Sequence, residues 1–359
     1  MAVQPMRVGV LGAGMISDAY LRTLRRAPAI DLAAIADLRQ EAAAAAAERF
    51  GIDATTADDL IADPAIELIV NLTPIVAHAQ TTMAALHAGK HVYSEKVLAT
   101  SYPEAVQLRL EAERRGLGLA CAPDTPLGTG FSAARRALAA GVIGAPVSAT
   151  AIMLRESVTE PGWYTDESMP FLDMGPYYLT ALIDLFGPAR TVAALGRSGT
   201  RDQLPPAQEY GSPIELTGVI DFHSGASATV QLGWGSSYDD EVTRLDVFGR
   251  TGVINFANPN NFGDPAYVGR YGDPATEIEG SRQPQDWDHN LRGIGVAEFA
   301  TALRERQLPR ARADVACHVV ELLNALFASS RHGHQVPITS TCEVPESITD
   351  EDRRSLLGV

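Results

Sequence analysis

The sequence predicts an α/β protein with a doubly wound parallel sheet in its N-terminal part, followed by an α+β domain with a large, mostly antiparallel sheet. Short apolar runs alternate with helix-period stretches from residue 7 to about 121, which favours a parallel sheet covered on both faces. From residue 146 to 256 the chain reads mostly as extended segments joined by turns. The length of 359 residues is enough for two domains.

In the first part, each predicted strand is an apolar run that ends in glycine or polar residues. Gly51, Gly89 and Gly116 are placed to end the helices between the strands, and Pro103 is tolerated in the first turn of the last helix. The predicted strands cover residues 7–11, 31–36, 67–71, 91–93 and 117–120.

The second part begins with a short helix that ends at Gly141. Its clearest extended segments are 147–153, 216–222, 226–232, 241–248 and 253–256. A helix is predicted near 177–185, a surface loop over 258–290, and two amphipathic helices at about 292–306 and 313–330.

The acidic tail from Glu343 is expected to be frayed. The predicted domains are 1–122, 123–342 and the tail 343–359.

Charge and composition argue against several classes of partner. The chain has 29 Lys+Arg and 44 Asp+Glu, a net charge of −15 that would repel nucleic acid. No apolar run approaches the roughly 20 residues of a membrane span, and the N-terminus lacks the pattern of a signal peptide. Three cysteines, and eight histidines without paired ligand spacing, indicate neither a disulfide framework nor a metal site. We expect a soluble, cytoplasmic protein of a reducing compartment.

A glycine-rich turn follows the first predicted strand and opens a helix. The first glycine permits the tight turn, the second lets the backbone approach a pyrophosphate, and the helix N-terminus offers N–H groups to the anion. Ser17 replaces the third glycine of the motif and is small enough for close helix–strand contact. These features predict a Rossmann dinucleotide-binding domain. The residues expected at the pyrophosphate are Gly12, Ala13, Gly14, Met15 and Ile16.

An acidic residue, Asp37, ends the second predicted strand. A carboxylate at this position accepts hydrogen bonds from both hydroxyls of an adenosine ribose and repels a 2′-phosphate. The alternative is a turn residue that contacts no ligand. NAD is therefore the favoured cofactor; NADP is less favoured, although Arg39 is able to accommodate a phosphate in part.

Polar residues also follow the third and fourth strands, at the sheet edge where ligands of such folds bind. Thr73 and Pro74 are expected to line the cofactor, and His78 either faces it or makes a structural hydrogen bond. Glu95 and Lys96 end the fourth strand and are expected in the same crevice. An ammonium group there can bind a substrate oxygen and stabilise a developing alkoxide.

The lysine content supports a special role for Lys96. The chain has only two lysines, Lys90 and Lys96, against 27 arginines, so generic surface charge explains Lys96 less well than in most chains.

In the second part, Asp173 and Tyr177 bracket a predicted helix start, with Pro176 in its first turn. A tyrosine hydroxyl can act as a general acid/base when a nearby ammonium group lowers its pKa. The alternative is an acid that stabilises the helix N-terminus, followed by core aromatics.

Taken in order, these segments resemble the Gfo/Idh/MocA family of NAD(P)-dependent oxidoreductases. Residues 95–97 read Glu-Lys-Val where the family has Glu-Lys-Pro, and 173–177 read Asp-Met-Gly-Pro-Tyr where it has Asp-x-x-x-His. The resemblance covers nearly the whole chain and includes residues 88–93, 139–144 and 171–175. Tyrosine at 177 is similar to a branch of the family in which tyrosine replaces the catalytic histidine.

The resemblance implies roles for individual residues. Lys96 would be the catalytic lysine between nicotinamide and substrate, and Tyr177 the acid/base. Asp173 would bind a substrate hydroxyl or orient its neighbours. Val97, in place of the family's proline, implies that Lys96 is held differently. Asp124 would contact the nicotinamide carboxamide or a sugar hydroxyl.

Two further expectations concern the substrate and the assembly. Trp163 and Tyr164 would either stack on a sugar ring or pack within their loop. Members of the family commonly assemble through the open face of the sheet in the second domain, which implies a homodimer or homotetramer. Four alternating apolar residues would lie either at that interface or against helices of the same subunit: Ala226, Ala228, Val230 and Leu232.

The function expected is NAD-dependent hydride transfer between nicotinamide and a secondary alcohol or ketone of a sugar, glycoside or polyol. One alternative is an NAD-recycling enzyme that cleaves glycosides by transient sugar oxidation and elimination. Another is a non-catalytic, NAD-bound sensor.

Overall fold

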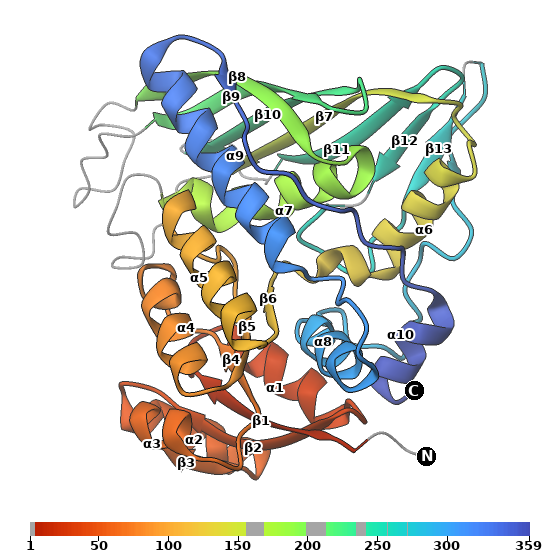
Figure 1. Cartoon of the computed structure of the whole chain (residues 1–359). Coiled ribbons are helices and arrows are strands. Elements are labelled where there is room, and N and C mark those ends of the chain that lie inside the picture. The colour runs from red at the N-terminus through yellow and green to blue at the C-terminus, as the bar shows by residue number, and fades with distance from the viewer. Residues whose placement is uncertain (1–3, 156–168, 199–212, 235–241, 257, 271) are drawn as a thin grey trace. The chain divides into compact units, whose positions relative to one another are not determined.

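The computed structural model describes residues 4–155, 169–198, 213–234, 242–256, 258–270 and 272–359 (Figure 1). The chain forms two compact units. The first comprises Met1–Leu127, Asn290–Val320 and Ile348–Val359, and the second Gly128–His289 and Glu321–Ser347.

The described part of the first unit contains a six-stranded parallel sheet with the order β3-β2-β1-β4-β5-β6, which confirms the predicted doubly wound fold. The strand order reverses between β1 and β4, where such sheets bind ligands beyond the carboxyl ends of their strands. The strands are β1 (Met6–Leu11), β2 (Ile30–Ala36), β3 (Asp53–Thr55), β4 (Leu68–Asn71), β5 (His91–Ser94) and β6 (Leu119–Cys121). The short, largely exposed β3 was not predicted because it has no apolar run.

Helices connect these strands in the predicted alternation. Gly51 and Gly116, at φ of 65° and 66°, end α2 and α5 in the left-handed conformation that glycine tolerates best. The helices are α1 (Ser17–Arg26), α2 (Gln40–Phe50), α3 (Ala57–Ala62), α4 (His78–His87) and α5 (Tyr102–Arg115). Two short 3-10 segments, η1 (Ile75–Ala77) and η2 (Thr125–Leu127), complete the connections.

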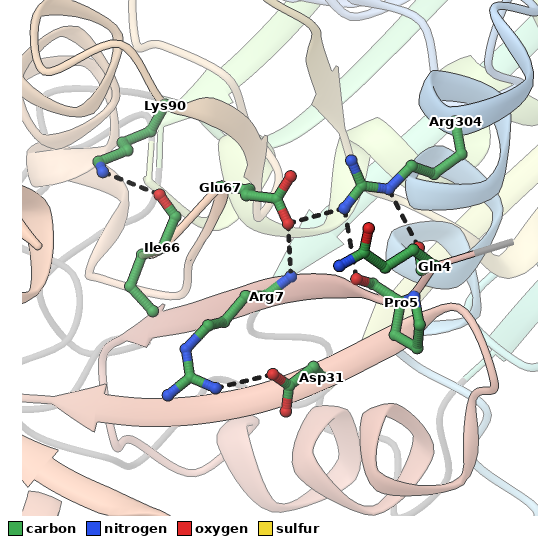
Figure 2. Close-up of polar contacts among 8 residues, drawn as sticks. All are labelled: Gln4, Pro5, Arg7, Asp31, Ile66, Glu67, Lys90 and Arg304. Atoms are coloured by element: carbon green, nitrogen blue, oxygen red, sulfur yellow. Dashed lines mark hydrogen bonds and ion pairs between the residues drawn. The ribbon is translucent and has the colours of Figure 1, made fainter. Parts of the chain in front are cut away.

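The first unit also includes α8 (Ile294–Glu305), which comes from far along the chain. Arg304 on α8 donates to the Glu67 carboxylate at 2.7 Å and to the carbonyl of Gln4 at 3.1 Å (Figure 2). Glu67 also accepts from the backbone N–H of Arg7 on β1. The unit is therefore discontinuous in sequence and does not follow the predicted boundaries at 122 and 342, because long-range ion pairs such as this one leave no local pattern.

The C-terminal tail ends in a helix, α10 (Asp350–Leu357), and the expectation that the tail is frayed was wrong for these residues. Thr349 and Asp352 form a reciprocal capping box at its start. Arg353 is fully buried and donates to the carbonyl of Leu127 at 2.7 Å. Figure 1 shows α10 beside α8 within the first unit.

The described part of the second unit contains a nine-stranded, mostly antiparallel sheet with the order β14-β13-β12-β11-β7-β10-β9-β8-β15, as predicted. Only the β10–β7 pair is parallel among the described strand pairs of this sheet. The strands are β7 (Pro146–Arg155), β8 (Ala189–Ser198), β9 (Pro213–Phe222), β10 (Ser227–Trp234), β11 (Val242–Gly249), β12 (Val253–Phe256), β13 (Tyr267–Gly269), β14 (Thr276–Glu277) and β15 (Val336–Pro337).

Helices cover one face of this sheet. They are α6 (Thr129–Ala139), α7 (Met169–Phe186) and the part of α9 (Ala313–His332) that belongs to this unit. At Gly175 of α7, an added Cβ would lie 2.8 Å from Leu323 of α9 and 3.5 Å from Leu232 of β10, so these elements pack closely there. Ala226, Ala228, Val230 and Leu232 are all buried, which fits packing against helices of the same subunit.

Helix α7 begins earlier than predicted. It starts at Met169, so Pro176 lies inside the helix rather than in its first turn. Proline is unfavourable in a helix interior because it lacks the N–H that would bond to the preceding turn, which is why the sequence pattern suggested a helix start here. Asp173 and Tyr177 are consequently one turn apart in the body of α7.

Candidate active site

The glycine turn after β1 has the geometry that a dinucleotide-binding loop requires. Gly12 has a φ of 107°, and a Cβ added to it would lie 2.5 Å from the Leu72 carbonyl oxygen at the end of β4. Both the left-handed backbone and this close approach therefore require glycine. At Gly14, by contrast, a Cβ would meet no atom within 4 Å. The turn therefore packs tightly against the end of β4 at Gly12, whereas the space beside Gly14 is open.

The first turn of α1 follows this open space. Its N-cap residue, Ile16, makes no side-chain capping hydrogen bond. The positive end of the helix dipole thus has no side-chain cap, which fits a bound anion such as a pyrophosphate. Met15, between Gly14 and Ile16, is exposed.

Asp37 lies beside the same turn, at the end of β2. One carboxylate oxygen accepts from the backbone N–H of Ala13 and the other from that of Arg39, both at 2.8 Å. A carboxylate has about four lone-pair positions, so acceptor capacity remains for ribose hydroxyls. The Arg39 guanidinium is exposed and lies 3.6 Å from Asp37. The residues present fit an NAD adenosine and pyrophosphate.

A buried asparagine at the end of β4 holds the next loop. The Asn71 side-chain oxygen accepts from the hydroxyl of Thr73 at 2.6 Å, and its amide donates to the carbonyl of His78 and the hydroxyl of Thr82 at 3.1 Å. The backbone N–H of Leu72 donates to Leu11 of β1 at 2.7 Å. The segment with Thr73 and Pro74 is thereby held at the reversal point of the sheet. A polar residue ending an apolar strand was the signal for Asn71 that the sequence prediction did not use.

His78 takes the structural alternative of the two that the sequence left open. Its ring is 1% exposed, with Nδ1 at 2.7 Å from the Val97 carbonyl and Nε2 at 2.7 Å from the Thr73 carbonyl. Burial lowers the pKa of this imidazole. The ring is enclosed between the two loops that carry Thr73 and Val97, and its expected contact with the cofactor stays a prediction.

Glu95 and Lys96 follow β5 at the same sheet edge. The Glu95 carboxylate is buried and accepts from the Tyr20 hydroxyl at 2.7 Å and from the backbone N–H of Lys96 at 2.9 Å. Glu95 therefore contacts the lysine's main chain, and its expected contact with a cofactor stays a prediction. The peptide bond between Lys96 and Val97 is cis. Tyr20, on α1, was not anticipated because it reads as an ordinary apolar-face residue.

The other lysine has a structural role at the opposite edge of the sheet. Lys90 precedes β5, is 6% exposed, and its ammonium donates to the carbonyls of Asp63 at 2.5 Å and Ile66 at 2.8 Å (Figure 2 draws the second contact). Lys96 follows the same strand and is half-buried at the carboxyl edge.

Asp124 bonds to the backbone at the start of α8. It is 2% exposed, and one oxygen accepts from the backbone N–H groups of Gly293 and Gly295 at 2.9 and 3.1 Å, at the start of α8. Burial raises the pKa of this carboxyl to about 6. The expected contact of Asp124 with the cofactor or a substrate hydroxyl stays a prediction.

In the second unit, Asp173 is half-buried and Tyr177 is buried on α7. Trp163 and Tyr164 lie outside the described residues. Within the described ranges, no three His, Cys, Asp or Glu side chains are grouped so as to hold a metal ion. No helix in the described part of the chain has the length and apolarity needed to cross a membrane.

Comparison with known proteins identifies the family. Residues 6–122 match an oxidoreductase family with an NAD-binding Rossmann fold, and residues 131–255 match the C-terminal domain of the same family. The chain belongs to the Gfo/Idh/MocA family. Residues 6–122, which lie in the first unit, are the NAD-binding Rossmann domain of an oxidoreductase.

Named relatives extend over much of the chain. D-glucoside 3-dehydrogenase of Escherichia coli is 25% identical over 365 residues, which covers 94% of this chain and 99% of the relative. scyllo-Inositol 2-dehydrogenase (NAD(+)) of Bacillus subtilis is 25% identical and covers 69% and 73%. A structure of levoglucosan dehydrogenase with NADH and levoglucosan has a TM-score of 0.80 at 21% identity and covers 93% and 100%, which shows the same fold.

Proposed function

We propose that the chain is an NAD-dependent dehydrogenase or reductase that acts on a secondary alcohol or ketone of a sugar, glycoside or polyol. The observation that carries the proposal is the position of Lys96. It lies at the carboxyl edge of the sheet that also holds the open glycine turn and Asp37, with its main chain bonded to Glu95. Full-length similarity to a glucoside dehydrogenase and similarity to an inositol dehydrogenase support this substrate class.

The cofactor contacts follow from the first unit. The turn from Gly12 to Ile16 would hold the pyrophosphate, Asp37 the adenosine ribose, and Thr73 and Pro74 would line the crevice. Bound NAD would supply the hydride acceptor. NADP is disfavoured since the Asp37 carboxylate would repel a 2′-phosphate.

The residues proposed to contact the substrate are Lys96, Asp173 and Tyr177. The Lys96 ammonium would donate a hydrogen bond to the reacting oxygen and stabilise negative charge that develops there. Tyr177 would hold or move the hydroxyl proton, and Asp173 would bind a neighbouring hydroxyl. Tyrosine in place of histidine at 177 is part of this proposal.

The test is a panel of sugars, inositols and glycosides with NAD and with NADP, followed by nicotinamide absorbance and product analysis. NADH formation with at least one compound is expected. Glycoside cleavage without NADH accumulation would instead support the redox-neutral alternative. NAD binding with no conversion across the panel would contradict both and favour a sensor.

We further propose that the chain forms a homodimer or homotetramer through the open face of the nine-stranded sheet. Leu195 on β8 is 76% exposed, and Val219 and Phe248 are also exposed. Val219 pairs with Ala193, which is two residues from Leu195, so Val219 and Leu195 lie on the same face of the sheet.

A charged substitution, Val219→Asp, should reduce the mass measured by light scattering to that of a monomer. An unchanged mass would argue against this interface.

The three cysteines are free and buried, which supports a reducing, cytoplasmic location.

A further inference from the structure

The main chain on both sides of Lys96 contacts buried side chains. On one side, the backbone N–H of Lys96 donates to Oε2 of Glu95 at 2.9 Å. On the other, the carbonyl of Val97 lies 2.7 Å from Nδ1 of His78 on α4. Hydrogen bonds to a charged group are about twice as strong as neutral ones, so the Glu95 contact restrains the lysine's backbone strongly.

The second oxygen of Glu95 is bonded to Tyr20, which comes from a different part of the fold. Tyr20 is fully buried on α1, and its hydroxyl donates to Oε1 of Glu95 at 2.7 Å. Burial and the nearby Glu95 carboxylate raise the pKa of Tyr20 well above its ordinary value, so the hydroxyl remains a donor at neutral pH. Without this donor, a buried carboxylate oxygen would be left unsatisfied, and Glu95 would be free to turn away from Lys96.

We propose that Tyr20 is a positioning residue for Lys96, acting through Glu95. It links α1, whose first turn follows the glycine loop, to the main chain that carries the lysine, and Nδ1 of His78 lies against the Val97 carbonyl on the other side of that lysine. The proposal deepens the proposed function, on which it rests for the role of Lys96. It assigns Glu95 and His78 to the support of the lysine rather than to contact with a ligand.

A second buried tyrosine provides a matched control. Tyr93 on β5 is also fully buried, and within the described residues its hydroxyl has no hydrogen-bond partner. Tyr20→Phe and Tyr93→Phe therefore each remove one buried phenol oxygen from the same unit. Only the first removes a hydrogen bond to Glu95, so a general effect of the deletion can be separated from positioning.

The two-lysine composition allows a direct measurement on the full-length protein. Labelling with ¹⁵N-lysine gives two backbone amide signals, from Lys90 and Lys96. The Lys90 amide donates to the Ala85 carbonyl at 3.0 Å and serves as the internal reference. In Tyr20→Phe we expect the Lys96 amide to exchange with solvent about tenfold faster and its signal to shift, as for a weakened charged hydrogen bond. The Lys90 signal should not change, and Tyr93→Phe should change neither.

Two results would overturn the proposal: Lys96 exchange that stays at the wild-type rate in Tyr20→Phe, or equal acceleration in both tyrosine variants. Two substitutions of Glu95 test the same contact in case Tyr20→Phe does not fold. Glu95→Gln keeps an oxygen that accepts from Lys96 and should retain most of the protection, whereas Glu95→Ala should lose it. Equal exchange in Gln and Ala variants would also contradict the role of Glu95.

Turnover gives the second readout. In Tyr20→Phe we expect kcat to fall about tenfold, while the NAD Kd measured by fluorescence stays within about twofold of wild type. An equal loss in Tyr93→Phe would indicate a structural effect. Absence of turnover in the wild type would refute the proposed function, yet the lysine amide measurement would still decide whether Tyr20 positions Lys96.

Discussion

The two lysines of this chain flank the same strand, β5, and have different surroundings. Lys90 is bonded to two backbone carbonyls at the amino end, whereas Lys96 follows the carboxyl end with its main chain bonded to Glu95. Identical side chains six positions apart therefore have separable roles. The expected roles are fold stability for the first and chemistry for the second.

Substitution of each lysine by alanine should separate the two roles. Lys96→Ala should lower kcat by about 10²–10³-fold, the usual effect of removing one donor to a developing oxyanion, with NAD affinity nearly unchanged. Lys90→Ala should retain kcat but lower the free energy of unfolding by about 1–3 kcal/mol, because two carbonyls lose a charged donor. Steady-state kinetics and denaturant unfolding check both. Retained turnover in Lys96→Ala would remove the proposed mechanism.

At the scale of elements, the glycine turn is tight at one glycine and open at the next. Gly12 is constrained by its φ of 107° and by the Leu72 carbonyl, while nothing lies within 4 Å of a Cβ at Gly14. Glycine is therefore required at position 12 by the fold itself. At position 14 we expect it to be required by the ligand.

Alanine substitutions at these positions should have opposite consequences. Gly14→Ala should leave the melting temperature unchanged, since the methyl group meets no protein atom, but weaken NAD binding about tenfold or more by blocking the backbone approach of the pyrophosphate. Gly12→Ala should destabilise the protein by about 2 kcal/mol or more. Calorimetry and fluorescence titration with NAD measure the two effects. Unchanged NAD affinity in Gly14→Ala would place the cofactor elsewhere.

The start of α8 depends on a buried carboxyl, which makes its contribution pH-dependent. Burial raises the pKa of Asp124 from 3.8 to about 6. The folded state therefore binds this proton more tightly than the unfolded chain, so the group's contribution to stability rises as pH falls from about 7 towards 4.

Asp124→Asn should remove this dependence. Between pH 7 and pH 5, the wild type should gain about 1 kcal/mol of unfolding free energy relative to the variant. Urea unfolding at the two pH values gives the difference. A change of opposite sign would mean that Asp124 has a lowered pKa in the folded protein.

At the scale of the whole molecule, the chain returns twice to its first unit. The segments 290–320 and 348–359 belong to the unit formed by the first 127 residues. The last of them is held by Arg353, a fully buried cation whose guanidinium donates to Leu127 and is paired with Asp350 at 2.6 Å.

Loss of this buried cation should destabilise the first unit. Arg353→Met should lower the free energy of unfolding by about 3 kcal/mol, since the Leu127 carbonyl and Asp350 lose a charged partner. Ser355→Ala, at an exposed position of the same helix, should have an effect within about 0.5 kcal/mol. Thermal unfolding of both variants makes the comparison, and equal stability would show that α10 contributes nothing to the unit.

What could be predicted from the sequence was local. The glycine turn, the acid at the end of β2 and the lysine after β5 are each visible within a few residues, and they sufficed to predict the parallel sheet and NAD as the cofactor. The contacts that join distant residues could not be predicted: Tyr20 with Glu95 are 75 positions apart and Arg304 with Glu67 are 237 apart. The same limit applies to His78 and Asp124, because their burial depends on loops and helices that only the folded chain brings to them.

The near-absence of lysine has a practical consequence. Amine-reactive dyes or coupling resins usually scatter over a protein's surface, but here arginine supplies 27 of the 29 basic side chains, and Lys90 is enclosed. Apart from the α-amino group, such reagents would be directed to Lys96. Competition between NAD and a fluorescent ester for that single amine would then reveal occupancy of the crevice even before a substrate is known.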